Sequence, residues 1–309
     1  MRALVTGGAG VLGSHLVDRL VAAGHAVEVI DDLSGGSLGN LGPARAEALR
    51  TGSDLKIHTL DVRAPELASV LTRRPPDVVF HLAQRSAATA GERLAAELTV
   101  VGGLNVLEAA VGGGVAKVVT ALDARLLYGH VATRDLPVKE AQPWQPDTLV
   151  GIAQHAVADL LAVYRTRHAL EFTAVAFADV YGPRRTDGVV ASLVADTRAG
   201  RPCSIDGDGR QTLDLLYVDD AVDALIRAAT RGTGLVVNVG TGQQTTVRDL
   251  ERMIAGPDAP APVRRPVEGE AARFAVSSAR ARIHLGWAPW TSLADGLALT
   301  RAAAGQAEG

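Results

Sequence analysis

The stretch Thr6-Gly7-Gly8-Ala9-Gly10-Val11-Leu12-Gly13 decides the fold, because it joins an apolar strand expected at residues 3–6 to an amphipathic helix expected at residues 11–23. The spacing of the glycines allows a tight turn, a close approach of backbone to a pyrophosphate, and a helix packed near the strand. The N-terminus of that helix offers free N–H groups and a partial positive charge to the phosphates. The stretch therefore predicts a dinucleotide site, with contacts from Gly7, Gly10, Val11, Leu12 and Gly13.

The end of the second apolar strand, Val29-Ile30-Asp31-Asp32, indicates which dinucleotide binds. A carboxylate about 20 residues after the glycine turn accepts hydrogen bonds from both ribose hydroxyls of NAD and repels a 2′-phosphate. Asp31 therefore favours NAD(H), and Asp32 and Ser34 are expected beside it. Ser34, Ser37 and Arg45 leave NADP(H) open, and a solvated turn carboxylate is the alternative interpretation of Asp31 or Asp32.

Short apolar runs alternate with amphipathic stretches through the first 180 residues. This alternation predicts an α/β fold with a doubly wound parallel (Rossmann) sheet, and an α+β arrangement is the alternative. We expect residues 1–180 to form the dinucleotide-binding domain and residues 181–309 to form a smaller α/β substrate lobe. Strands are expected at 3–6, 27–30, 55–60, 77–82, 117–121 and 172–177, and helices at 11–23, 64–71, 92–111 and 148–168.

The second part of the chain has a looser pattern. Strands are expected at 213–218 and 235–239, and helices at 189–199, 221–230, 277–285 and 292–304. Asp219 or Asp220 is expected to cap the helix at 221–230, and Thr245 or Thr246 to cap another. The tail after Ala304 is expected to fray.

The composition excludes several classes of protein. A net charge of -3 over 309 residues gives no basic field for nucleic acid or an anionic membrane. The single cysteine, Cys203, excludes an internal disulfide and suits a reducing cytoplasm. We find no signal-peptide layout, no apolar run near the roughly 18 residues that span a bilayer, and no metal-ligand spacing among the histidines.

Further motifs carry a family resemblance. They are Asp31-Asp32-Leu33-Ser34, Leu60-Asp61-Val62-Arg63, Val79-Phe80-His81-Leu82-Ala83, Val180-Tyr181-Gly182-Pro183-Arg184, Tyr217-Val218-Asp219-Asp220 and Leu285-Gly286-Trp287. With them the chain resembles, nearly end to end, the extended short-chain dehydrogenase/reductases, in particular the nucleotide-sugar epimerases and dehydratases. The resemblance implies a four-helix dimer interface from residues 92–111 and 148–168, or a monomer. It also implies cofactor contacts from Asp61, Val62, Leu82, Ala83, Gln84, Ala121, Gln154 and Phe177.

The resemblance breaks down at the residues that handle protons. It places Val150 where the family has a tyrosine and Gln154 where it has a lysine, and its serine or threonine falls on Asp123 or Ala124. Asp123 and Gln154 are the remaining catalytic candidates. Asp123 would act as an acid if burial raises its pKa, and capping a turn is the alternative. Tyr128 is expected to pack, and His155 to lie at the surface or an interface.

The residues implied to hold a sugar nucleotide also differ. Asp179 stands where the family has asparagine, and Leu213 where it has arginine. Both changes oppose a diphosphate, and at ~1.5–3 kcal/mol each they would weaken its binding a hundredfold or more. Arg264 or Arg265 is either a remnant of the clamp or a solvated pair. Together with apolar Leu122, Leu126 and Leu127, these changes predict an apolar pocket, with substrate contacts from Ser86, Asp123, Val150, Asp179 and Leu213.

These differences lead to a functional hypothesis with two alternatives. The hypothesis is an NAD(P)H-dependent ketoreductase of an aromatic polyketide ketone, of the kind found in angucyclinone antibiotic pathways such as that of simocyclinone. A phenol of the substrate would supply the proton, since losing a general acid costs roughly 10²–10⁴ in rate. The alternatives are a nucleotide-sugar 4-epimerase or dehydratase, and a catalytically inactive NAD sensor or scaffold.

Overall fold

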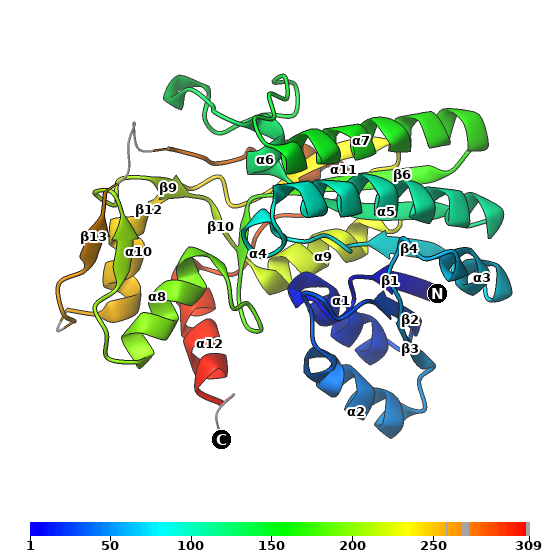
Figure 1. The fold of residues 1–309 in the computed structure, drawn as a ribbon, viewed down its shortest axis with the longest axis horizontal. Coiled ribbons are helices and arrows are strands. Elements are labelled where there is room, and N and C mark those ends of the chain that lie inside the picture. Colours follow the sequence, from blue (N-terminus) through cyan, green and yellow to red (C-terminus); the bar gives the residue numbers. More distant parts are fainter. Residues whose placement is uncertain (258, 267–271, 307–309) are drawn as a thin grey trace.

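A parallel seven-stranded sheet forms the centre of the computed structural model, which describes residues 1–257, 259–266 and 272–306 (Figure 1). The strand order is β11-β6-β5-β4-β1-β2-β3. The chain moves outward from β1 and then returns to place β4 on its other side, so β1 and β4 flank a crevice at their carboxyl ends. The α/β prediction is confirmed. The strands are β1 (Arg2–Thr6), β2 (Ala26–Asp31), β3 (Leu55–Thr59), β4 (Val78–His81), β5 (Lys117–Asp123), β6 (Glu171–Phe177) and β11 (Leu235–Val239).

Helices cover both faces of the sheet and enclose two separate apolar cores. Within β1, Ala3 and Val5 belong to one core and Leu4 to the other, as the period-two geometry of a strand requires. The first core lies under α1 (Val11–Ala22) and α9 (Val218–Ala228), with α2 (Gly42–Thr51) packed on α1. The second lies under α3 (Glu66–Arg73), α5 (Glu92–Gly112) and α7 (Leu149–His168). Helix α2 escapes prediction because it buries only Ala44 and Ala48.

Strand β11 comes from the segment expected to form the substrate lobe, yet it pairs in parallel with β6 and completes the main sheet. From the rest of that segment, helix α9 and residues 279–284 pack on the main sheet. Residues 188–213, 245–255, 263–265 and 293–306 build the smaller body at the left of Figure 1. The division at residue 180 stays a prediction. The remaining elements are α8 (Gly188–Arg198), β8 (Ser204–Asp206), β9 (Thr212–Leu213), β10 (Leu215–Tyr217), β12 (Thr245–Thr246), α10 (Val247–Ala255), β13 (Val263–Arg265), α11 (Ala279–His284) and α12 (Leu293–Gln306), with β7 (Asp179–Tyr181) paired to β10.

Several local expectations need correction. The strand expected at 213–218 is two short strands, β9 and β10, which are separated at Asp214. Neither Asp219 nor Asp220 caps α9, because Tyr217 holds the N-cap position and both carboxylates lie in the first turn. Thr246 does cap α10, through its side chain and the N–H of Asp249. Helix α12 runs to Gln306, and the rest of the tail lies outside the described residues.

Helix α5 corrects the expectation about apolar length. It has 21 residues and a window with mean hydropathy 1.5, so by length and composition it could cross a membrane. Half of that window is buried in the fold, and the helix packs between α3 and α7. A Cβ added at Gly102 would lie 2.8 Å from Val62, and one at Gly103 would lie 3.0 Å from Val157. These close contacts are those of a core helix.

Candidate functional site

The glycine turn is built to receive a pyrophosphate. Gly7 has φ +69°, and a Cβ there would come within 2.6 Å of the carbonyl oxygen of Leu82 at the end of β4. A Cβ on Gly13 would overlap the carbonyl oxygen of Gly7. No side chain caps α1 at Gly10, so the N–H groups of its first turn remain available to phosphate oxygens. The backbone here fits a dinucleotide.

Asp31 ends β2 beside this turn. Its Oδ2 accepts the N–H of Ala9 at 2.8 Å and its Oδ1 accepts the N–H of Leu33 at 2.8 Å. Burial raises the pKa of Asp31, although the two N–H donors oppose the shift. Each carboxylate oxygen keeps a second lone pair for a ribose hydroxyl. Asp32 instead accepts the N–H and hydroxyl of Ser34, an exposed turn contact.

Asp61 and Val62, two of the predicted cofactor contacts, have structural partners in the protein. Arg63 binds Asp61 at 2.7 Å, and this side-chain hydrogen bond lowers the pKa of Asp61. Val62 is buried against α5, and its carbonyl oxygen accepts a hydrogen bond from Asn105. Ala83 and Leu82 follow β4, where the N–H of Ala83 reaches the hydroxyl of Thr6 at 3.4 Å.

A cavity of about 310 Å³ opens at the carboxyl ends of β5 and β6. It brings together eight residues that the sequence predicts for the site: Val11, Leu12, Gln84, Ala121, Asp123, Phe177, Asp179 and Leu213. Val150 is instead buried at the start of α7, and Ser86 caps the short helix α4 (Ala87–Ala90). Neither of these two lines the cavity. The wall also includes residues that sequence reasoning missed: Tyr181, Arg185, Asp187, Val189, Val190 and Leu215.

Gln154 connects three elements at the base of the cavity. Its Oε1 accepts the N–H of Asp123 at 2.8 Å, and its Nε2 donates to Oε1 of Gln84 at 3.0 Å. Gln84 then donates to the carbonyl oxygen of Ala121 at 2.6 Å. Gln154 is almost fully buried. The chain of amides therefore fixes the end of β5 relative to α7 and to the loop after β4.

Asp123 ends β5 with its carboxylate at the cavity. Its Oδ1 accepts the N–H of Leu126 at 3.1 Å and so caps α6 (Ala124–Tyr128), and whether it also transfers protons stays a prediction. The side chain stays open to water in the cavity. Desolvation by the surrounding protein, followed by the charge of Asp179, raises the pKa of Asp123 to about 6. A carboxylate with that pKa can exchange protons near neutral pH.

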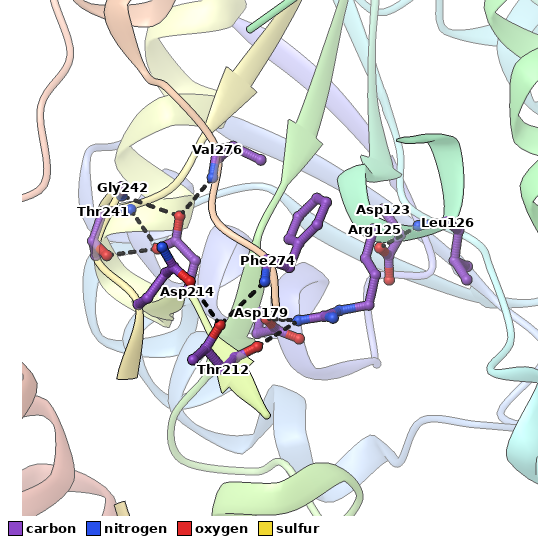
Figure 2. Close-up of polar contacts among 11 residues, drawn as sticks. Asp123, Arg125, Leu126, Asp179, Thr212, Asp214, Thr241, Gly242, Phe274 and Val276 are labelled. Atoms are coloured by element: carbon purple, nitrogen blue, oxygen red, sulfur yellow. Dashed lines mark hydrogen bonds and ion pairs between the residues drawn. The ribbon is translucent and has the colours of Figure 1, made fainter. Parts of the chain in front are cut away.

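Asp179 is paired with a cation that the sequence pattern did not reveal. Figure 2 shows Arg125 reaching from α6 to Asp179 and Thr212. Its Nη2 lies 3.1 Å from Oδ2 of Asp179 and 3.3 Å from the carbonyl oxygen of Thr212, next to Leu213. The guanidinium also lies over the ring of Phe274, 4.8 Å from its centroid. The carboxylate at position 179 is therefore neutralised by a residue 54 positions away.

Asp214 holds the neighbouring loops in place (Figure 2). This fully buried carboxylate accepts hydrogen bonds from the N–H and hydroxyl of Thr241, and from the N–H groups of Gly242 and Val276. Burial raises its pKa despite these donors. It thereby fixes the break between β9 and β10 beside the cavity.

Other residues singled out in the sequence lie away from the cavity wall. The hydroxyl of Tyr128 donates to Asn238 at 3.2 Å in the core, and His155 packs edge-on against Trp144. Arg265 pairs with Asp206 at 2.7 Å, and Arg264 binds the carbonyl oxygen of Asp208, both on the exposed strand β13. Arg264 and Arg265 thus form exposed contacts between β13 and residues 206–208, as the interpretation as a solvated pair expects.

Comparisons with known proteins agree with this geometry. The model of the NAD dependent epimerase/dehydratase family matches residues 3–240. The chain is 38% identical to UDP-glucose 4-epimerase of Mycolicibacterium smegmatis, over 97% of each protein. A UDP-glucose 4-epimerase from Thermotoga maritima, solved with UDP-glucose, superposes with TM-score 0.91 at 32% identity over 99% of each chain. The Thermus thermophilus UDP-glucose 4-epimerase complex with NAD gives TM-score 0.88 at 29% identity, over 99% of this chain and all of that one.

These relatives overturn two expectations from the sequence. The polyketide ketoreductase hypothesis and its apolar aromatic ketone substrate are wrong, because the relatives are named for nucleotide sugars. The physical error was to treat positions 179 and 213 in isolation. Asp123, Asp179, Asp187 and Arg185 place charged groups in a wall that is otherwise largely apolar, and Leu122 and Leu213 are the members of the predicted apolar set that line it. The chain belongs to the NAD-dependent epimerase/dehydratase family of extended short-chain dehydrogenase/reductases.

Proposed function

We propose that this chain is an NAD-dependent nucleotide-sugar 4-epimerase in which Asp123 carries the proton. The observation that supports this most directly is the position of Asp123 at the end of β5, on the wall of the cavity and with a pKa raised to about 6. The 38% identity with a UDP-glucose 4-epimerase makes UDP-glucose the first substrate to test.

The cofactor part of the proposal depends on the glycine turn. The uncapped N-terminus of α1 would bind the pyrophosphate, and Asp31 would accept the ribose hydroxyls. Bound NAD would supply a hydride acceptor, and in its reduced form a hydride donor, for the sugar carbon. In this proposal Asp31 favours NAD over NADP. A comparison of the dissociation constants of the two cofactors tests that preference. A cytoplasmic location remains part of the proposal. It is supported by Cys203, a buried free thiol that forms no disulfide, because such a thiol suits a reducing compartment.

Asp123 would manage both proton transfers. Its carboxylate accepts the proton of the sugar hydroxyl while the C–H bond of that carbon breaks, and the carbon becomes a carbonyl. When hydride returns to the opposite face of the carbonyl, Asp123 gives the proton back to the oxygen, and the configuration is inverted. A tyrosine needs a neighbouring cation to ionise near pH 7, whereas an aspartate of pKa about 6 does not. Uncharged Gln154 is compatible with this role, and its assignment to the family's lysine position stays a prediction.

The test is direct conversion. Purified protein with NAD and UDP-glucose should form UDP-galactose, which chromatography detects. Asp123→Asn should lower kcat by roughly 10²–10⁴. Asp135→Asn, at an exposed carboxylate away from the cavity, is the control and should keep full activity. A panel of other UDP- and dTDP-sugars separates epimerase from dehydratase products. Tight binding of nucleotide sugars with no product from any of them would refute catalysis and favour a sensor.

A further inference from the structure

The guanidinium of Arg125 is an unassigned cation that binds Asp179, a residue of the cavity wall. It leaves α6 two residues after Asp123 and reaches Asp179, whose side chain lines the cavity. Only its Nη2 makes hydrogen bonds to the part of the chain that the structure describes, to Asp179 and Thr212. A guanidinium has five N–H donors in a planar fork, so the Nε and Nη1 edges keep donors for a ligand.

The charges of the cavity explain why such a cation is needed. Among the described residues, the wall has three carboxylates, those of Asp123, Asp179 and Asp187, and one guanidinium, that of Arg185. Arg185 is committed to Asp187 at 3.0 Å and to the carbonyl oxygen of Val180 at 3.0 Å. A nucleotide sugar carries two negative charges on its diphosphate. Without another cation, the wall would repel the substrate class that the proposed function requires.

We propose that Arg125 is the diphosphate-binding residue of this chain, and that Asp179 positions the guanidinium and limits its affinity for the diphosphate. The inference rests on the proposed function. The contact with Thr212 brings the guanidinium beside Leu213, a side chain with no charge of its own. The ring of Phe274 packs against one face of the guanidinium, and the salt bridge to Asp179 fixes its direction. The donors left over on its edge form the anion site.

This arrangement predicts opposite effects for the two partners. Removal of Arg125 deletes a charged donor and leaves the carboxylate of Asp179 facing the diphosphate, so binding should weaken. Conversion of Asp179 to asparagine keeps a polar partner but removes a competing anion, so binding should strengthen. A pair that served only the fold would give no such change of sign, because both substitutions would break the same salt bridge.

The experiment measures the Kd of UDP by calorimetry on the full-length protein at low salt. Arg125→Met should weaken UDP binding by roughly 10–100-fold, the size expected for one charged hydrogen bond. Asp179→Asn should tighten it by about 2–10-fold, as expected for removal of a partly screened charge. The double variant should bind more tightly than Arg125→Met alone. The affinity of the wild type should also fall more steeply with salt than that of Arg125→Met.

Controls separate this inference from folding and from the proposed function. Arg201→Met removes an arginine from a 2.9 Å ion pair with Asp196 away from the cavity, and should leave UDP binding unchanged. Thermal unfolding shows whether Arg125→Met is folded. If it is poorly folded, Arg125→Lys serves as the second variant, because it keeps the charge, and it should lose less affinity than Arg125→Met. If the wild type binds no UDP, both proposals fail. If the wild type binds UDP and Arg125→Met binds equally well, or Asp179→Asn weakens binding, only the assignment of Arg125 and Asp179 fails.

Discussion

The amide chain from Gln154 through Gln84 to Ala121 should be energetically coupled. Gln154→Leu leaves the N–H of Asp123 and Oε1 of Gln84 without partners, whereas Gln84→Leu leaves Nε2 of Gln154 and the carbonyl oxygen of Ala121 without them. A buried group that loses its partner costs ~1–3 kcal/mol. Because water in the cavity reaches Gln84, we take about 1–2 kcal/mol for each group. Each single substitution should then lower the free energy of unfolding by about 2–4 kcal/mol.

The double variant distinguishes a network from independent contacts. With both glutamines replaced, only the N–H of Asp123 and the carbonyl oxygen of Ala121 stay unpaired, so the loss should again be about 2–4 kcal/mol. Independent effects would instead sum to about 4–8 kcal/mol. Urea unfolding followed by circular dichroism measures the free energy of unfolding of all three variants. The control is Gln243→Leu at an exposed position, whose free energy of unfolding should stay within about 0.5 kcal/mol of the wild type. Losses that add within about 0.5 kcal/mol would refute the coupling.

Three further predictions concern other groups. The value of kcat/KM should rise with pH and reach half its plateau near pH 6, because only the ionised carboxylate of Asp123 accepts a proton, and a flat profile between pH 5 and 8 would contradict this role. Gly13→Ala should weaken NAD binding more than about tenfold in a fluorescence titration, whereas Gly112→Ala, with open space around its Cβ, should not. Burial lowers the pKa of Lys117 to about 8 in the folded protein, from its ordinary value of 10.5. Between these two pH values the unfolded chain therefore keeps a proton on Lys117 that the folded chain has lost. The wild type should therefore gain stability over Lys117→Met as pH rises from about 8 towards 10.5 in urea titrations, and no trend would argue against the shift.

The sequence predicts those features whose causes are local. The turn at Gly7, Gly10 and Gly13 and the apolar strands around it follow from backbone freedom and from burial on both faces of a parallel sheet. The cap at Thr246 follows from a hydroxyl three residues before an N–H that it can reach. Each of these needs only neighbours in the chain, so the pattern of residues suffices.

The electrostatics of the cavity could not be predicted in the same way. Arg125 and Asp179 meet because β5 and β6 are adjacent in the sheet, and no periodicity marks that meeting. The raised pKa of Asp123 depends on the walls around it and on Asp179, which are also tertiary facts. Positions 179 and 213, taken one at a time, predict the wrong substrate class, whereas the folded chain compensates the carboxylate of Asp179 with Arg125.

The place of β11 at the rim of the main sheet has a practical consequence for protein engineering. A gene cut after codon 180 would discard β11 and leave the long edge of β6 with unsatisfied backbone groups. Such a fragment would tend to self-associate through that edge instead of yielding an isolated cofactor-binding module. Shuffling of substrate-recognition segments between homologues should therefore use junctions that keep residues 235–239 with the parent sheet.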